Sequence, residues 1–139
     1  MADTLTETRN EATAIAESYY DSSDADNFYA TIWGGEDIHI GLYGGPGDSI
    51  RDASRKTVVH MAERLRNLKP DARVLDIGSG YGGAARYLAA NHKAHVTCLN
   101  LSRVENERNR QMSAEQGVGA FVNVVHGSFE EIPKPPFGG

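Results

Sequence analysis

The sequence has a single cysteine, Cys98, so it can form no internal disulfide and no cysteine cage around a metal. Its five histidines share no metal-ligand spacing, and we therefore expect no metal site. No apolar run approaches the roughly 20 residues of a membrane-spanning helix. The first residues also lack the basic and apolar regions of a secretion signal. These absences predict a cytoplasmic protein without a membrane partner.

Positive charge is also scarce. The chain has 14 Lys and Arg against 19 Asp and Glu, a formal net charge of -5. The basic residues alternate with acids, as in Arg51-Asp52 and Glu63-Arg64, instead of forming the basic face that nucleic-acid binding needs. We therefore predict no nucleic-acid partner. With 40% hydrophobic residues the 139-residue chain is too apolar to be disordered, and its length is that of one domain or part of one.

A regular alternation of strand and helix patterns begins at residue 73. The helix after the second strand is marked by a capping box, Ser102-x-x-Glu105, and by Gly117 at its end. Strands separated by helices of this length form βαβ units with parallel strands. The predicted fold class is α/β with a Rossmann-like parallel sheet. Its strands are expected at residues 73–77, 94–99 and 121–125.

The residues before this alternation form a different kind of segment. Apolar positions at helical spacing predict a helix over residues 4–20, followed by a turn-rich stretch at 21–27. Aromatic residues interrupted by glycines then predict an irregular, lid-like segment up to residue 48. A second helix is predicted from Ser49 until Pro70. We accordingly divide the chain into an N-terminal helix and lid-like segment (1–48) and a partial Rossmann-like domain (49–139).

The main functional signal is a strand that runs directly into glycines, Leu75-Asp-x-Gly-x-Gly-x-Gly82. Glycines let the backbone approach a ligand closely, and the free amides at the start of the following helix offer hydrogen bonds. A nucleotide-like ligand is therefore predicted at this turn. Gly78, Gly80 and Gly83 also satisfy G-x-G-x-x-G, so the half-domain of a nicotinamide-dependent oxidoreductase is an alternative.

Two side chains separate these interpretations. Asp76 precedes Gly78 by two residues, and its carboxylate would order the turn and attract a cationic ligand but repel a pyrophosphate. Asn100 stands about 20 residues beyond the glycines, where a dinucleotide domain has an acid for the ribose. An amide can still hydrogen-bond two hydroxyls, although Asn100 could also be an ordinary strand-end residue. The pattern favours a positively charged cofactor.

At this point the sequence resembles the class I S-adenosylmethionine-dependent methyltransferases. Within them it is similar to the sarcosine and dimethylglycine N-methyltransferases, which make glycine betaine. The resemblance runs from about Tyr19 to Pro133. It rests on the glycine motif together with Tyr19-Tyr-Asp-Ser-Ser-Asp-Ala-Asp-Asn-Phe-Tyr29, Ile32-Trp-Gly-Gly-Glu-Asp-Ile-His-Ile-Gly-Leu-Tyr43, Asp48-Ser-Ile50 and Cys98-Leu-Asn-Leu-Ser102.

The resemblance implies that the cofactor is S-adenosylmethionine and that the substrate is a small amine, sarcosine or dimethylglycine. It assigns no catalytic residue, because methyl transfer to a neutral amine needs alignment more than acid or base help. Aromatic residues of the lid-like segment would close over the cofactor, although they could equally be packing residues. The implied cofactor-binding residues are Tyr20, Tyr29, Trp33, His39 with Ile40, Asp76, Gly78, Gly80, Asn100, Leu101, Ser128 and Phe129.

The family's pattern continues through four more strands after Pro133. We therefore expect the chain to correspond to an amino-terminal half that is inactive alone. The strand at 73–77 would then have an open edge, which predicts a homo-oligomer through that edge unless the missing half covers it. A non-catalytic, self-associating fragment is the remaining alternative.

Overall fold

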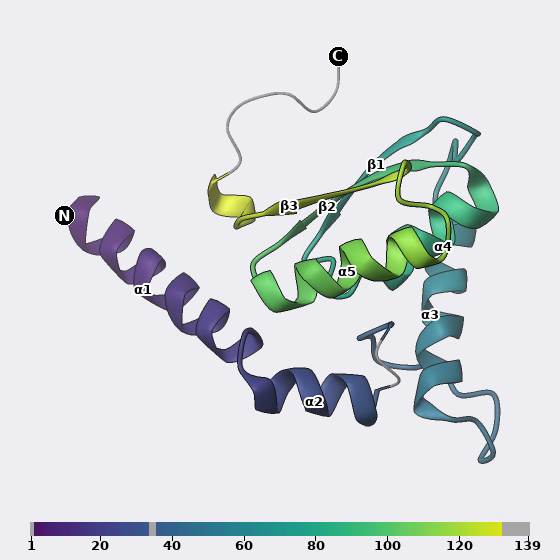
Figure 1. Ribbon diagram of the computed structural model, residues 1–139, viewed down its shortest axis with the longest axis horizontal. Coiled ribbons are helices and arrows are strands. Elements are labelled where there is room, and N and C mark those ends of the chain that lie inside the picture. The colour runs from purple at the N-terminus through teal and green to yellow at the C-terminus, as the bar shows by residue number, and fades with distance from the viewer. Residues whose placement is uncertain (1, 34–35, 132–139) are drawn as a thin grey trace.

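The computed structural model describes residues 2–33 and 36–131 (Figure 1). Helices and strands alternate from α3 onward, after two helices at the N-terminus. No helix within these ranges is both long and apolar enough to cross a membrane. In chain order the elements are α1 (Ala2–Tyr20), α2 (Ser23–Thr31), α3 (Ile50–Arg64), β1 (Arg73–Ile77), α4 (Gly83–His92), β2 (His95–Asn100), α5 (Arg103–Glu115), β3 (Val122–His126) and a 3₁₀ turn, Phe129–Glu131.

The three strands form one parallel sheet in the order β1-β2-β3. Asp76 on β1 stands opposite Cys98 on β2, and Cys98 stands opposite Val124 on β3. Consecutive parallel strands that are added in one direction by right-handed crossovers have both connecting helices on the same face. Figure 1 shows α4 and α5 on one side of the sheet. The predicted α/β class with a Rossmann-like parallel sheet is confirmed.

The core lies between the sheet and these helices. Its buried cluster includes Val96 and Cys98 of β2 packed with Ala85 and Leu88 of α4. The neighbouring strand residues point to the opposite face because side chains alternate along a strand. There Ile77 is 53% exposed and Val125 is also exposed. Within the described residues this second face is only partly covered, and β1 lies at the edge of the sheet.

The stretch that the sequence predicted as turn-rich and irregular contains the helix α2. Its N-terminus is capped by Ser22, whose hydroxyl accepts a hydrogen bond from the Ala25 amide at 3.2 Å. Asp24 and Asp26 in the first turn add negative charge near the positive end of the helix. The composition that indicated a turn therefore also stabilises a helix start. The prediction of irregular structure was wrong for residues 23–31.

Helix α3 ends at Arg64, six residues before the predicted end at Pro70. Leu65 is already extended, and Asn67 has a left-handed backbone with φ of 63°. Leu68, which continued the helical spacing in the sequence, packs against the core from the connecting loop. The apolar spacing therefore correctly indicated that Leu68 packs against the core, but it placed the end of the helix too late.

Gly82, the last glycine of the motif, stands at the N-cap of α4 with φ of 80°. A side chain there would overlap the Asn109 amide of α5. Gly82 is also absent from the residues that line the pocket described below. Its role in this structure is close packing between the turn and α5.

Replacing Gly82 with alanine is expected to lower the free energy of unfolding by roughly 3 kcal/mol, because a steric overlap adds to the left-handed backbone cost. Gly117→Ala is the matched control, since Gly117 has φ of 74° but open space around it. It should cost roughly 1 kcal/mol. Urea unfolding of both variants measures the difference, and equal losses would contradict the packing role of Gly82.

Candidate cofactor site

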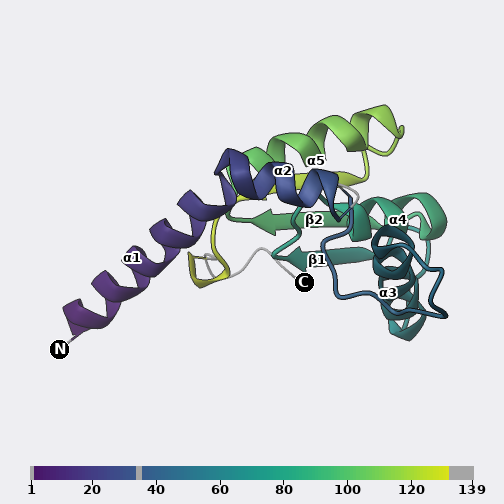
Figure 2. The same ribbon diagram turned by 90° about the horizontal axis from the view of Figure 1, so that it is seen from below.

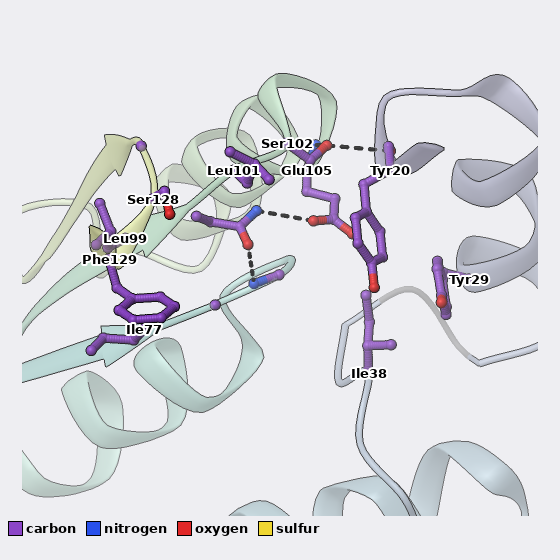
Figure 3. Close-up of a pocket in the computed structure, with 14 residues that line it drawn as sticks. Tyr20, Tyr29, Ile38, Ile77, Leu99, Leu101, Ser102, Glu105, Ser128 and Phe129 are labelled. Carbon is purple, nitrogen blue, oxygen red and sulfur yellow. Dashed lines mark hydrogen bonds between the residues drawn. The ribbon is translucent and has the colours of Figure 1, made fainter. Parts of the chain in front are cut away.

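A pocket of about 350 Å³ opens at the carboxyl ends of the three strands. Ligands bind at this end of parallel α/β sheets because the strand-end loops and helix N-termini meet there. The loops after β1, β2 and β3 each contribute residues, and the N-terminal helices close one side (Figure 3). The lining consists of Tyr20, Tyr29, Ile38, Ile77, Gly78, Gly80, Leu99, Asn100, Leu101, Ser102, Glu105, Gly127, Ser128 and Phe129.

Most residues expected at the cofactor line this one pocket, although they come from distant parts of the sequence. They belong to the N-terminal helices, the glycine turn, the end of β2 and the loop after β3. Figure 3 shows Tyr20 and Tyr29 on one side of the pocket and Phe129 with Ile77 on the other. The expected residues in the lining are Tyr20, Tyr29, Gly78, Gly80, Asn100, Leu101, Ser128 and Phe129.

Besides Ile40, which is described below, the expected residues Trp33, His39 and Asp76 are not part of the lining. The Trp33 ring nitrogen donates to the His39 carbonyl at 3.0 Å, which fixes the segment that carries Ile38. Burial raises the pKa of Asp76, and nearby His39 partly opposes this shift. A cofactor role for these three residues stays a prediction.

Ile38 faces the pocket, whereas its neighbour Ile40 is 90% exposed. The sequence had pointed to His39 and Ile40. The choice between adjacent residues depends on how the segment is held against the core. Asp37 supplies that anchor through an ion pair with Arg55 at 2.9 Å. Sequence spacing carries no signal for this contact between a loop and α3.

The glycine turn forms the floor of the pocket. Gly78 and Gly80 have φ of 69° and 55°, values that side chains other than glycine rarely adopt. The Gly78 amide donates to the Leu99 carbonyl at 2.7 Å, which joins the turn to the end of β2. A β-carbon on Gly80 would stand 3.5 Å from Ile38, in the space between the turn and the lid-like segment. The turn can therefore pass close beneath a ligand.

Asn100 braces this turn from the end of β2. Its Oδ1 accepts a hydrogen bond from the Gly80 amide at 3.2 Å, and its Nδ2 donates to Glu105 Oε2 at 2.9 Å (Figure 3). Asn100 is thus neither an ordinary strand-end residue nor a fully free ligand group. Direct contact between its amide and a ligand stays a prediction.

Glu105 is a pocket residue that the sequence reasoning used only as part of a capping box. The Ser102 hydroxyl does accept from the Glu105 amide at 3.2 Å, but the Glu105 carboxylate turns to Asn100. Burial raises the pKa of this carboxyl, the Asn100 hydrogen bond lowers it, and the charges of Asp21 and Asp26 raise it further. The sequence shows an acid in the first turn of the helix after β2, but the burial of Glu105 and its contact with Asn100 are visible only in the structure.

Comparison with known proteins agrees with this geometry. The profile of a family described as mycolic acid cyclopropane synthetase matches residues 6–138. A solved structure from Galdieria sulphuraria, assigned as a sarcosine dimethylglycine methyltransferase, superposes with a TM-score of 0.73 at 44% identity, covering 80% of this chain and 44% of that one. The cyclopropane synthase MmaA2 from Mycobacterium tuberculosis shares the fold, with a TM-score of 0.77 at 21% identity over 88% of this chain and 42% of that one.

The fold is therefore that of a class I S-adenosylmethionine-dependent methyltransferase. More narrowly, the chain belongs to the mycolic acid cyclopropane synthetase family. Among curated relatives, the sarcosine/dimethylglycine N-methyltransferase of Halorhodospira halochloris is 56% identical over 124 residues. That alignment covers 89% of this chain and 44% of the relative, so the chain spans less than half of the relative's length. The family assignment decides against the oxidoreductase alternative.

Glu105→Gln tests the buried acid. Folding raises the pKa of this carboxyl above its ordinary value of 4.5. The free energy of unfolding is therefore highest below about pH 4.5, where the carboxyl is protonated in both states, and it falls as pH rises through the folded pKa. The glutamine variant keeps the hydrogen bond acceptor for Asn100 and has no such loss. We expect its free energy of unfolding to exceed that of the parent by about 1 kcal/mol at about pH 8 but not at about pH 4. Urea unfolding at both pH values measures this, and a pH-independent difference would show that Glu105 ionises normally.

Proposed function

We propose that this chain binds S-adenosylmethionine in the strand-end pocket, as the cofactor-binding part of an N-methyltransferase acting on sarcosine and dimethylglycine. The observation that carries the proposal is the convergence of the left-handed glycine turn, the end of β2 and the loop after β3 on one pocket. The identity to curated sarcosine/dimethylglycine N-methyltransferases supports the choice of amine. A cytoplasmic location and the division at residue 48 belong to the same proposal.

In this proposal each part of the cofactor contacts a different wall of the pocket. The backbone at Gly78 and Gly80 passes beneath the methionine part. Leu101 and Phe129 supply apolar surface for the adenine, with Ser128 beside it, while Asn100 and Glu105 face the ribose with hydrogen-bonding groups. The electron-rich faces of Tyr20 and Tyr29 suit the positive sulfonium. Their rings lie 6.5 Å apart and are stacked.

When bound, S-adenosylmethionine supplies an activated methyl group to a neutral amine. The chain's contribution is alignment, because holding two reactants at near-attack distance accounts for roughly 7 to 11 kcal/mol. An amino-acid acceptor also brings a carboxylate, which proteins bind best with arginine. Among the described residues, no arginine or lysine lines the pocket. We therefore assign no acceptor site to this chain.

Cofactor binding is tested by calorimetric titration with S-adenosylhomocysteine. The chain should bind it, and Gly80→Val should abolish binding because the side chain fills the space between the turn and Ile38. Gly117→Val is the control, since it carries a similar left-handed strain outside the pocket. Unfolding curves must show that both variants fold. Unaltered affinity in Gly80→Val would place the cofactor elsewhere.

Methyl transfer is tested with radiolabelled S-adenosylmethionine and glycine, sarcosine or dimethylglycine. The full-length protein that carries this sequence should methylate sarcosine and dimethylglycine. The 139-residue chain alone should bind cofactor without turnover, because its pocket has no cationic side chain for the acceptor carboxylate within the described residues. Turnover by the purified chain would contradict this part of the proposal.

We also propose that the 139-residue chain self-associates. Within the described residues β1 pairs only with β2, and Ile77 and Val125 are exposed on the partly covered face. Both features support self-association, because open edges and apolar faces promote pairing. Light scattering should give a mass above that of a monomer, and hydrogen exchange at 74–77 should slow as concentration rises. A monomer at high concentration with protected β1 amides would refute self-association.

A further inference from the structure

The two N-terminal helices, residues 2–31, form an arm that is attached to the body mainly by polar contacts. Figures 1 and 2 show α1 projecting away from the sheet. Among the arm side chains that the structure describes, residues 11–31, only Ala25 is buried. Ile15, Tyr19 and Phe28 are largely exposed. Apolar burial therefore contributes little to holding the arm in place.

The first polar attachment is at the carboxyl end of β3. The Glu17 carboxylate lies 3.1 Å from His126 Nε2, at the last residue of β3. Arg103 of α5 also contacts Glu17, with its Nε at 3.5 Å from Oε1. This attachment reaches the strand end that leads into Gly127 and Phe129 of the pocket.

The second attachment is at the loop after β2. Asp21 Oδ1 accepts hydrogen bonds from the Ser102 hydroxyl at 2.7 Å and from the Val104 amide at 3.2 Å. The arm thereby adds a carboxylate to the N-terminus of α5, where negative charge is favourable. Tyr20, which precedes Asp21, lines the pocket.

The third attachment is at the glycine turn itself. The Tyr81 hydroxyl, between Gly80 and Gly82 in sequence, donates to Asp26 Oδ1 at 2.9 Å. Arg108 of α5 donates to the other oxygen of Asp26 at 2.5 Å. Burial opposes ionisation of Asp26, but the hydrogen bonds from Arg108 and Tyr81 outweigh it and lower the pKa of the carboxyl. Tyr81 is 1% exposed, so its hydroxyl is held in place by the core.

These three carboxylates, Glu17, Asp21 and Asp26, thus bind near the carboxyl ends of three different strands, and the pocket lies among the same strand ends. Tyr29 follows Asp26 by three residues, which puts both on the same face of α2. We propose that Glu17, Asp21 and Asp26 are positioning residues that hold Tyr20 and Tyr29 over the pocket, and that the Asp26–Tyr81 bond sets how fast a bound cofactor leaves. The second part rests on the proposed function.

The docking is tested without any ligand, by hydrogen exchange of the 139-residue chain. An undocked nine-residue helix is unstable in water, so the amides of α2 should exchange once its attachment is lost. Asp26→Ala, which leaves no acceptor for Tyr81, and Tyr81→Phe should each speed exchange at residues 23–31 about tenfold, without changing exchange in β2. Asp24→Ala, at an exposed acid in the same turn, is the control and should leave exchange unchanged. Unchanged α2 exchange in both test variants would overturn the proposal.

The kinetic part is tested by displacing bound S-adenosylhomocysteine in a stopped-flow experiment. Trp33 reports on the arm, because its ring packs 6.2 Å from that of Tyr29. Asp26→Ala and Tyr81→Phe should each raise the dissociation rate about tenfold. The double variant should be no faster than Asp26→Ala, because Asp26→Ala already removes the Tyr81 bond together with the Arg108 contact. Asp24→Ala should dissociate like the parent.

The outcomes separate the two proposals. A parent chain that does not bind S-adenosylhomocysteine would refute the proposed function, while the exchange experiment would still decide whether the carboxylates dock the arm. Faster exchange of α2 combined with an unchanged dissociation rate would refute control of cofactor release by Asp26 and Tyr81. If the increases in dissociation rate from the two substitutions add in the double variant, the two residues act separately. That outcome would also contradict control of release by the Asp26–Tyr81 bond.

Discussion

The buried guanidinium of Arg86 joins three parts of the chain that lie far apart in sequence. From α4 it donates to the Tyr81 carbonyl of the glycine turn at 2.5 Å, to Asn109 of α5 at 3.1 Å, and to Glu36 of the lid-like segment at 3.3 Å. A charge that is 1% exposed is strongly unfavourable unless it is fully paired. Burial lowers the pKa of Arg86, and the charge of Glu36 opposes that shift. The turn, α5 and the lid-like segment must therefore be in place together.

This constraint determines which residues reach the pocket. Glu36 also pairs with Arg55 at 3.3 Å, and the adjacent Asp37 pairs with the same arginine. The segment comes so close to the start of α4 that a side chain at Gly83 would overlap the Asp37 carboxylate. With residues 36 and 37 fixed in this way, Ile38 is the next side chain to reach the pocket. Ion pairs outside the pocket therefore determine that Ile38, and not His39, lines it.

These contacts also explain what the sequence could predict. The strand Arg73–Ile77 and the glycine turn were recognisable because their signals are local: an apolar run, then glycines at left-handed positions. The family resemblance added pocket residues from distant segments, such as Tyr20 and Phe129. Helix α2 was missed because Ser22 and its neighbouring acids suit a turn as well as a helix start. Ile38 and Glu105 were missed because their positions depend on partners that no spacing rule connects to them.

The pocket is organised by polar bonds, whereas the core beneath it is apolar. Asn100 joins the glycine turn to Glu105, Arg86 joins it to α5, and Tyr81 joins it to the arm. Such bonds are directional and contribute only when both partners are aligned, so they fix geometry more strictly than apolar packing does. The apolar core between the sheet and α4 is built on the sheet face that carries Val96 and Cys98, and it does not depend on the partly covered face. The geometry of the strand-end pocket can therefore be set by this chain even though the other face of its sheet is partly exposed.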